Sequence, residues 1–445
     1  MDTSDENTTR REEAVATVAA TEAASNSATS WPAVGFETLP WHRDPDDLLG
    51  VSKTRRRKIL PTYEAAVPAF IAGLDVSLPG DIHNRLAEVA ATLARFDAEQ
   101  AARGYDLPSL LLRSESAASS QIENLTSSVR NVALAELSDS APANARVIVG
   151  NLAAMRRALA LDDSNDPDGP SGPGDHDGRL SVEVIRAIHR ELINRGGTGE
   201  SFGGKLREEQ VWVGGTAYSP HGAAFVPPAA ARVPAYLEDL VAFAGRDDVN
   251  PITKAAIVHA QFETVHPFID GNGRTGRTLL HRMLRTEGVL EHATLPVSAG
   301  LLHGIDAYME AIRRYQAGEI HPIVEQLAEA LELAVSLGSL VARRLDEVIA
   351  SWRERMDERA GSAILRLPDV LVGQPVVDSV YLAERLGVTR RAATTVIDRA
   401  CGYGILRPCG NRQRGEFYQA DELIDVLEEI SDMRSIRRVL ASGKL

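Results

Sequence analysis

The sequence predicts a mainly α-helical protein of two or three domains with one short β-hairpin. The chain has 445 residues, which exceeds the roughly 250 to 300 residues at which a single hydrophobic core stops growing. Apolar residues recur at three- and four-residue steps along most of the chain, as they do in amphipathic helices. Residues 205–228 instead combine β-branched and aromatic residues with glycines and end in Pro-Pro, which predicts a hairpin.

Helical periodicity is clearest in residues 82–103, where apolar side chains form one stripe. We expect further helices at residues 181–194, 230–244, 252–265, 274–287 and 322–358. Gly338 marks a candidate break in the last of them, because glycine is unfavourable within a helix. After Gly361 the composition changes, which predicts a separate small domain.

Charge and composition exclude several classes of protein. The net charge of −14 argues against a chain that coats nucleic acid or an anionic membrane. The two cysteines, Cys401 and Cys409, cannot form a disulfide framework, and no zinc-binding spacing is present. The N-terminus does not resemble a signal peptide, and no run approaches 18 apolar residues. We expect a cytoplasmic protein without membrane contact.

Two acidic segments carry most of the net charge. Residues 1–30 hold six acidic and two basic residues, and residues 162–178 hold six Asp and no basic residue. The first predicts a disordered tail over 1–34, because its side chains bury too little apolar surface to offset the ordering entropy. The second predicts a solvated loop over 161–178, although part of it has calcium-loop spacing that we consider a weaker alternative.

The stretch 266–277 has the features of a phosphate-binding turn. Pro267 discourages the preceding helix from continuing, and glycines at 271 and 273 let backbone N–H groups converge at the start of the next helix. Arg274 and Arg277 lie in the first turn of that helix, where its dipole disfavours cations. A polyphosphate between the two arginines would remove this cost.

Two further residues of this stretch bear chemically useful groups. Asp270 supplies a carboxylate suited to Mg²⁺, which binds one or two carboxylates plus phosphate oxygens. His266 can accept a proton near neutral pH. Each residue alone also fits an ordinary turn, a solvated surface or a core histidine. Together they supply almost every group that phosphoryl chemistry needs.

Residues 266–277 read HPFIDGNGRTGR. They resemble, at all nine specified positions, the signature HPFx(D/E)GNGRxxR of the Fic family, whose enzymes move a nucleotide monophosphate onto a protein hydroxyl. The resemblance implies that His266 takes the proton of a target Ser, Thr or Tyr hydroxyl, and that Asp270 holds Mg²⁺ against the phosphates of ATP. It implies an anion cradle and phosphate contacts at Gly271, Asn272, Gly273, Arg274 and Arg277.

The resemblance extends to the predicted hairpin. The sequences GGKLREEQVWVGG and AAFVPP are similar to the family's flap and the strand that follows it. The family's flap pairs through its backbone with a segment of the target. The resemblance therefore implies target docking by Glu208, Glu209, Gln210, Val211, Trp212 and Val213.

Upstream of the signature lies a candidate inhibitory motif. Ser119 and Glu123 are four residues apart and share a helical face, and Asn124 suits the left-handed residue that ends a helix. On its own this is an ordinary capped helix end. Beside the signature it resembles the family's inhibitory motif (S/T)xxxE(G/N), which implies that Glu123 pairs with Arg277 where the γ-phosphate would bind.

The C-terminal segment resembles a winged helix-turn-helix. Asp378 or Ser379 can cap one helix and Thr389 a second, whose first turn carries Arg390 and Arg391. These two arginines are candidate DNA contacts. We favour contact with a protein, either a target or a second copy in a homodimer, because residues 361–445 are nearly neutral overall.

The sequence thus predicts a mainly α protein with a Fic helical core, a short β-hairpin flap, an N-terminal inhibitory helical region and a C-terminal winged helix-turn-helix domain. The resemblance implies an autoinhibited protein adenylyltransferase (AMPylase) that uses ATP and Mg²⁺ and acts on a target protein and on itself. Removal of AMP, transfer of another nucleotide and a DNA-binding regulator that senses ATP remain alternatives. The expected units are 1–34 (tail), 35–160 (N-terminal region), 161–178 (loop), 179–350 (core, with flap 205–219) and 361–445 (C-terminal domain).

Overall fold

The structure is a computed structural model that describes residues 31–41, 52, 59–138, 140–160, 179–196, 201–409 and 416–442. Most of the expected tail and the whole loop at 161–178, with its calcium-loop alternative, lie outside the described residues. Within the described part of the chain, no helix is both long and apolar enough to cross a membrane.

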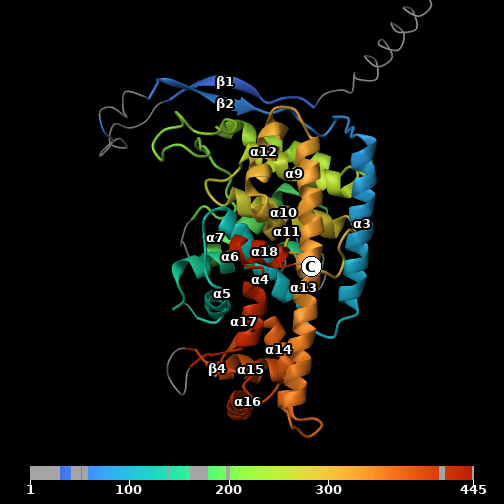
Figure 1. The fold of residues 1–445 in the computed structure, drawn as a ribbon. Helices are drawn as coiled ribbons and strands as arrows, with labels where there is room; N and C mark the ends of the chain where they lie inside the picture. The colour runs from blue at the N-terminus through green and yellow to red at the C-terminus, as the bar shows by residue number, and fades with distance from the viewer. Residues whose placement is uncertain are drawn as a thin grey trace, which may run out of the picture.

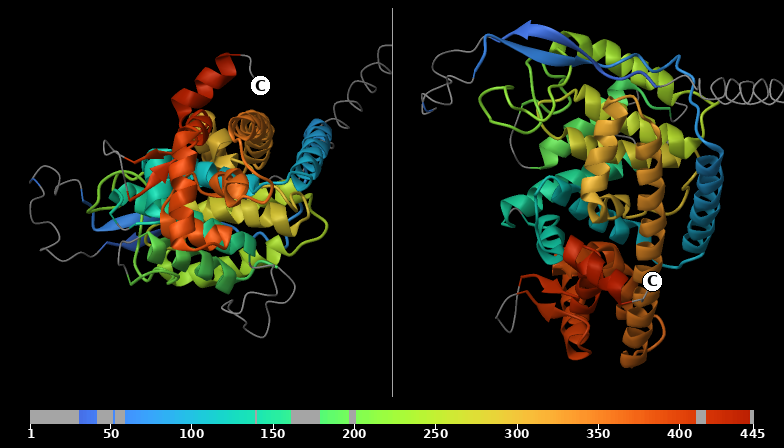
Figure 2. Two further views of the ribbon diagram at one scale, coloured as in Figure 1. Left: turned by 90° about the horizontal axis from the view of Figure 1, so that it is seen from below. Right: turned by 45° about the horizontal axis from the view of Figure 1, so that its top comes forward.

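The molecule is mainly helical, as predicted, and the long helix α13 runs along most of its length (Figure 1). A larger helical body surrounds its first half and a smaller C-terminal domain its second half (Figures 1 and 2). The helices of the body are α3 (Gly80–Ala101), α4 (Leu107–Ile122), α5 (Val129–Ala135), α6 (Ala143–Ala160), α7 (Val182–Arg195), α8 (Val233–Ala244), α9 (Pro251–Val265), α10 (Asn272–Thr286), α11 (Val297–His303), α12 (Ile305–Gln316) and α13 (His321–Arg355), with the 3-10 turn η2 (Ala230–Arg232) before α8.

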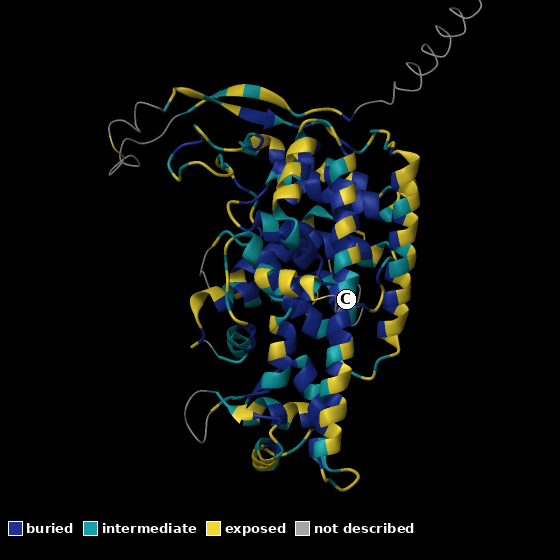
Figure 3. Ribbon diagram, in the orientation of Figure 1, coloured by how far each residue is buried: buried dark blue, intermediate teal, exposed yellow. Residues whose placement is uncertain are grey.

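Helix α9 forms the centre of the body. It is buried on nearly all sides, and most of its residues are apolar or small. Asn250 caps its start by accepting hydrogen bonds from the N–H groups of Ile252 and Thr253, and Pro251 occupies the first turn. Helix α10 packs against α9 and α6 and is also mostly buried (Figure 3). The loop between α9 and α10 is the predicted phosphate-binding turn.

Helix α13 continues through Gly338, so the expected break is wrong. A Cβ atom at this position would lie 2.9 Å from the Cζ atom of Phe96 on α3. Glycine therefore permits α3 and α13 to approach closely, and the packing of the two helices outweighs glycine's low helix propensity.

The N-terminal region is not entirely helical, which corrects the prediction for residues 35–160. Strands β1 (Gly35–Pro40) and β2 (Thr62–Val67) pair antiparallel, with Gly35 opposite Val67. The N–H group of Ala66 on β2 also donates to the carbonyl of Val226, next to the flap. The hairpin expected over 205–228 is present only as isolated bridges, Val213 with Phe225 and Thr216 with Ser219.

The C-terminal domain combines short helices with a three-stranded sheet of order β3-β5-β4. Asp378 caps α15, Gly387 takes a left-handed conformation after it, and Thr389 caps α16. The domain packs on the body through contacts of α14 with α4, α17 with α5 and α18 with α11. Its elements are η3 (Ala363–Arg366), α14 (Leu367–Gly373), β3 (Val376–Val377), α15 (Ser379–Leu386), α16 (Arg390–Gly402), β4 (Arg407–Pro408), β5 (Tyr418–Gln419), α17 (Asp421–Glu428) and α18 (Met433–Ala441).

Candidate active site

His266 ends helix α9 in a strained backbone conformation. Its φ of 51° and ψ of 62° lie in the left-handed region, which non-glycine residues adopt at a cost of about 1 to 3 kcal/mol. The N–H group of His266 still bonds to the carbonyl of Phe262, and Pro267 prevents another helical turn. The chain therefore turns sharply at the residue predicted to be the catalytic base.

The imidazole of His266 is neutral and has a defined tautomer. Its Nδ1 atom lies 3.3 Å from the carbonyl oxygen of Glu263, which can only accept a hydrogen bond. Nδ1 therefore carries the proton, and Nε2 keeps a free lone pair. Burial disfavours the imidazolium ion and lowers the pKa of His266 to about 4, against the opposing effect of the Glu263 carbonyl. The side chain can thus accept a proton at neutral pH.

The loop after His266 is closed by the side chain of Asn272. Its Oδ1 accepts from the N–H group of Phe268 and its Nδ2 donates to the carbonyl of Phe268, both at 2.9 Å. Phe268 is fully buried, as expected for a structural residue. Gly271 has a φ of 76° and precedes the first turn of α10. Asn272 therefore shapes the anion cradle with its side chain.

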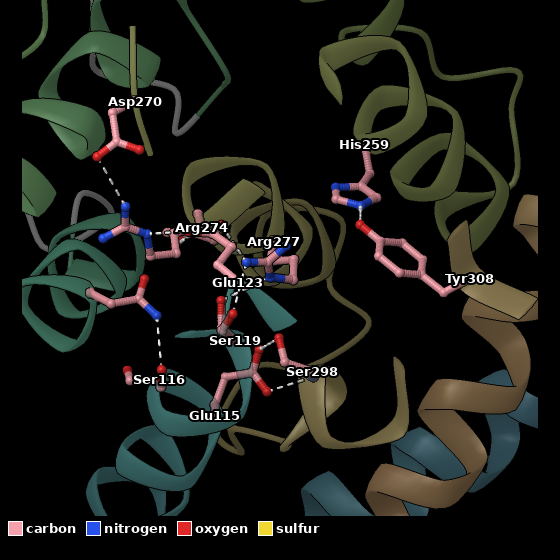
Figure 4. A network of polar contacts seen from close by, with 12 residues as sticks. Glu115, Ser116, Ser119, Glu123, His259, Asp270, Arg274, Arg277, Ser298 and Tyr308 are labelled. Carbon is pink, nitrogen blue, oxygen red and sulfur yellow. Dashed lines mark hydrogen bonds and ion pairs between the residues drawn. The ribbon is translucent and has the colours of Figure 1, made fainter. Parts of the chain in front are cut away.

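Two buried arginines lie at the start of α10 and share one carboxylate. Arg274 Nε is 2.7 Å from Glu123 Oε2, and Arg277 Nη2 is 2.8 Å from Glu123 Oε1 (Figure 4). Arg277 also donates to the hydroxyl and to the carbonyl of Ser119, at 2.9 and 2.8 Å. The sequence predicted the contact with Arg277 but not the second contact with Arg274.

Glu123 lies where its charge is unfavourable for its own helix. It is the C-cap residue that directly follows α4, where the helix dipole is negative, and Asn124 follows in the left-handed conformation with a φ of 62°. The positive charges of Arg274 and Arg277 are likewise unfavourable at the N-terminal end of α10, where the helix dipole is positive. The two mismatched helix ends face each other, so the ion pairs offset both costs.

The same face of α4 carries one more acidic residue that the sequence analysis missed. Glu115 is fully buried and accepts hydrogen bonds from the N–H and hydroxyl of Ser298 (Figure 4). It also lies 2.9 Å from His281 Nε2 on α10. Glu115, Ser119 and Glu123 are spaced at four-residue steps, so one stripe of α4 contacts α10. This spacing is visible in the sequence and could have identified Glu115.

Asp270 lies at the open side of the loop. Its side chain is 62% exposed and is 3.5 Å from Arg274 Nη2. Among the described residues, no cluster of three or more His, Cys, Asp or Glu side chains is placed to bind a metal ion. A single exposed carboxylate beside a phosphate cradle fits Mg²⁺, because this ion keeps several waters and takes phosphate oxygens as ligands.

The flap contributes exposed backbone near the site. Glu208, Glu209 and Val213 are exposed, whereas Gln210, Val211 and Trp212 are half-buried. Among the described residues, the N–H groups of residues 208–212 make no main-chain hydrogen bond. Residues 208–212 form no strand of their own, but backbone with unpaired N–H groups can pair with an added segment.

Three other side chains near the loop were not predicted. His189 and Arg207 are buried and contact the loop backbone, and Glu263 lies beside Arg277. They come from segments that show only ordinary helical or strand patterns, so no signal in one sequence marked them. In the C-terminal domain, the predicted DNA contacts Arg390 and Arg391 are exposed, and Arg390 donates to Ser379.

The comparisons with known proteins agree on one family. Residues 179–284 match the Fic/DOC family. Protein adenylyltransferase fic-1 of Caenorhabditis elegans is 29% identical over 164 residues, which are 36% of this chain and 29% of that protein. Protein adenylyltransferase Fic of Drosophila willistoni is 28% identical over 158 residues, with the same two shares. The chain thus spans less than a third of the length of these relatives.

Solved Fic structures are also similar. A Fic family protein from Desulfovibrio desulfuricans G20 is 21% identical, with a TM-score of 0.47, and the match covers 78% of this chain and 97% of that one. For a Fic-1 fragment of C. elegans the identity is 22% and the TM-score 0.41, covering 57% and 70%. Residues 179–284 of this chain thus match the Fic/DOC family, the family that the motif at 266–277 resembles.

Proposed function

We propose that the protein transfers AMP from ATP to a Ser, Thr or Tyr hydroxyl of a target protein. The observation that carries this proposal is a neutral histidine, His266, in the loop that leads into α10, whose first turn holds the buried arginines Arg274 and Arg277 at the positive end of the helix dipole. The adenylyltransferase names of the relatives support the same reaction. The target is unidentified.

The chemistry follows from the loop geometry. The target's hydroxyl oxygen attacks the α-phosphorus and its proton passes to Nε2 of His266. The bond between the α-phosphorus and the oxygen bridging to the β-phosphate breaks, and pyrophosphate leaves. Arg274 and Arg277, with the N–H groups of the cradle, stabilise the negative charge of the phosphates. Asp270 would hold Mg²⁺, which neutralises part of that charge when bound.

We propose that the protein as described is autoinhibited. Glu123 occupies both arginines, and the γ-phosphate of ATP would need them. The flap supports the target side of the proposal, because the N–H groups of 208–212, which have no main-chain partner among the described residues, can pair with an extended segment. For residues 361–445 we propose a winged helix-turn-helix that contacts protein, supported by its element order and its packing on α4 and α5.

Labelled ATP tests the reaction. The purified protein and its Glu123→Gly variant are incubated with ATP labelled at the α- or the γ-phosphate, and label on protein is counted. We expect label on protein only from ATP labelled at the α-phosphate. It should appear first on the Glu123→Gly variant itself, by self-labelling. Label from the γ position would indicate a kinase instead. DNA binding with no transfer from either ATP would favour the regulator described among the alternatives above.

The pH profile of the Glu123→Gly variant provides an independent test. Because burial lowers the pKa of His266 to about 4, we expect self-labelling to stay nearly constant from pH 8 to 6 and to fall only as the pH approaches 4. Glu123 raises the pKa of His266, so its removal shifts the acidic limb to lower pH. A limb centred near 6.5 would contradict a base with this lowered pKa.

One neighbouring group requires a control in that experiment. Burial raises the pKa of Glu263 to about 7, against the opposing effect of Arg277. Titration of this carboxyl could therefore change the rate near neutral pH. The profile is measured in parallel with Glu263→Gln, and a limb near 7 that disappears in this variant belongs to Glu263.

A further inference from the structure

Arg207 is a buried cation at the start of the flap that contacts carbonyl groups from three segments. Its side chain is 2% exposed. Nε lies 2.8 Å from the carbonyl oxygen of His266, Nη1 3.1 Å from that of Glu209, and Nη2 2.5 Å from that of Pro228. Among the described residues it has no ion-pair partner. The guanidinium therefore joins the loop after α9 to Glu209 of the flap and to Pro228 in the segment that follows the flap.

The position of Arg207 explains how its charge is tolerated. The carbonyl of His266, and that of Val265 at 3.4 Å, belong to the C-terminal end of α9, where the helix dipole is negative. Burial nevertheless lowers the pKa of Arg207 to about 10. A lysine could not replace these contacts, because a planar guanidinium offers five N–H donors in a fixed fork.

His189 on α7 makes a similar connection at the other end of the loop. Its Nδ1 accepts from the N–H group of Gly204, so its Nε2 carries the proton and donates to the carbonyl of Asp270; both distances are 2.9 Å. Its ring stacks on Phe268, with centroids 3.7 Å apart and planes 6° apart. One neutral imidazole thus contacts both the residue proposed to bind Mg²⁺ and Gly204, the residue just before the flap.

We propose that Arg207 and His189 form a flap latch that fixes the target-binding segment relative to the catalytic loop. The inference rests on the proposed AMP transfer. His266 and Asp270 lie at the two ends of the loop, and each gives its main-chain carbonyl to a buried side chain that also bonds to the flap. The latch residues are positioning residues, because the target's hydroxyl must reach Nε2 of His266 when the target pairs with the flap.

The latch is tested by variants in the Glu123→Gly background. Arg207→Met keeps the bulk of the side chain but loses its donors, and Arg207→Lys keeps the charge but loses the fork. His189→Phe keeps the stacking on Phe268 but loses both hydrogen bonds, whereas His189→Gln can restore the bond to Asp270. The matched control is Arg232→Met, which removes an exposed bidentate arginine pair with Glu37.

Three measurements are made on each variant: the rate of self-labelling at saturating ATP, the KM for ATP, and hydrogen–deuterium exchange of the main-chain amides of residues 204–228, which include the flap. For both Arg207 variants and His189→Phe we expect self-labelling to fall about 100-fold, the cost of a displacement of about 1 Å. The KM for ATP should stay within about 3-fold for the Arg207 variants, and flap amides should exchange faster. His189→Gln should recover part of the rate, and Arg232→Met should match its parent.

Two results would overturn the latch. One is self-labelling within about 3-fold of the parent in folded Arg207→Met or Arg207→Lys protein. The other is a loss of rate that follows only the unfolded fraction, measured by circular dichroism, without faster flap exchange in the folded protein. If the Glu123→Gly parent itself transfers no AMP, the proposed function fails, while the exchange data still decide whether Arg207 and His189 hold the flap.

Discussion

Glu123→Gly should transfer AMP about 100-fold faster than the wild-type protein. If the blocked site is favoured 99:1, its free energy is about 2.7 kcal/mol below that of the open site. This is half of the roughly 5.5 kcal/mol needed to change an equilibrium from 1:99 to 99:1. Two short ion pairs to nearly buried arginines can supply that difference. The measurement is self-labelling with α-labelled ATP under initial-rate conditions, at equal protein concentration.

Glu136 provides the matched control for this variant. Its carboxylate also bridges two arginines, Arg113 at 2.6 Å and Arg156 at 2.9 Å, but it lies outside the candidate active site. Glu136→Gly should leave the rate of transfer unchanged while lowering stability. Equal rates of transfer for Glu123→Gly and wild type would rule out autoinhibition by Glu123. A higher rate in both Glu123→Gly and Glu136→Gly would indicate a general loosening of the N-terminal region.

The activation has a specific electrostatic origin. Removal of Glu123 leaves Arg274 and Arg277 buried at the positive end of α10. Arg277 keeps its bonds to the hydroxyl and carbonyl of Ser119, and Arg274 keeps its longer contact with the exposed carboxylate of Asp270. The phosphates of ATP can then supply the missing negative charge. We therefore expect ATP to raise the melting temperature of Glu123→Gly more than that of the wild-type protein, in the same direction as the rate.

The sequence predicted the parts of the site that lie within one short stretch. His266, Asp270, Arg274 and Arg277 are close in the chain, and the glycines and proline around them restrict the backbone locally. The pairing with Glu123, which is 151 and 154 residues away from the two arginines, depended on family resemblance. Arg274 as its second partner could not be predicted, because it depends on how α4 packs against α10.

Long-range contacts also account for the errors in the predicted fold. The β1–β2 ribbon pairs strands separated by a segment of the chain, and no tight turn signals this pairing. Gly338 indicated a break, but Phe96 of α3 makes it a point of close packing. Arg207 and His189 contact main-chain carbonyl and N–H groups, which every residue possesses, so the sequence does not show what their side chains bind.

His266→Asn in the Glu123→Gly background should lower the rate of transfer by about 10² to 10⁴-fold, the usual cost of removing a general base. Asparagine is the most informative replacement, because it tolerates the left-handed backbone at this position, and its amide can donate to the carbonyl of Glu263 as Nδ1 does. It lacks only the basic Nε2 atom. His266→Ala should lose as much activity and some stability as well.

ATP binding separates a missing base from a damaged site in these two variants. The His266 side chain contacts the carbonyl of Glu263, while the cradle depends on Asn272, Arg274 and Arg277, so the Kd for ATP should stay within about 3-fold of the parent. Calorimetric titration with ATP measures this Kd under conditions without turnover. Retained transfer in His266→Asn would require another base, and Glu263, which lies near the loop with its pKa raised to about 7, would be the first to replace.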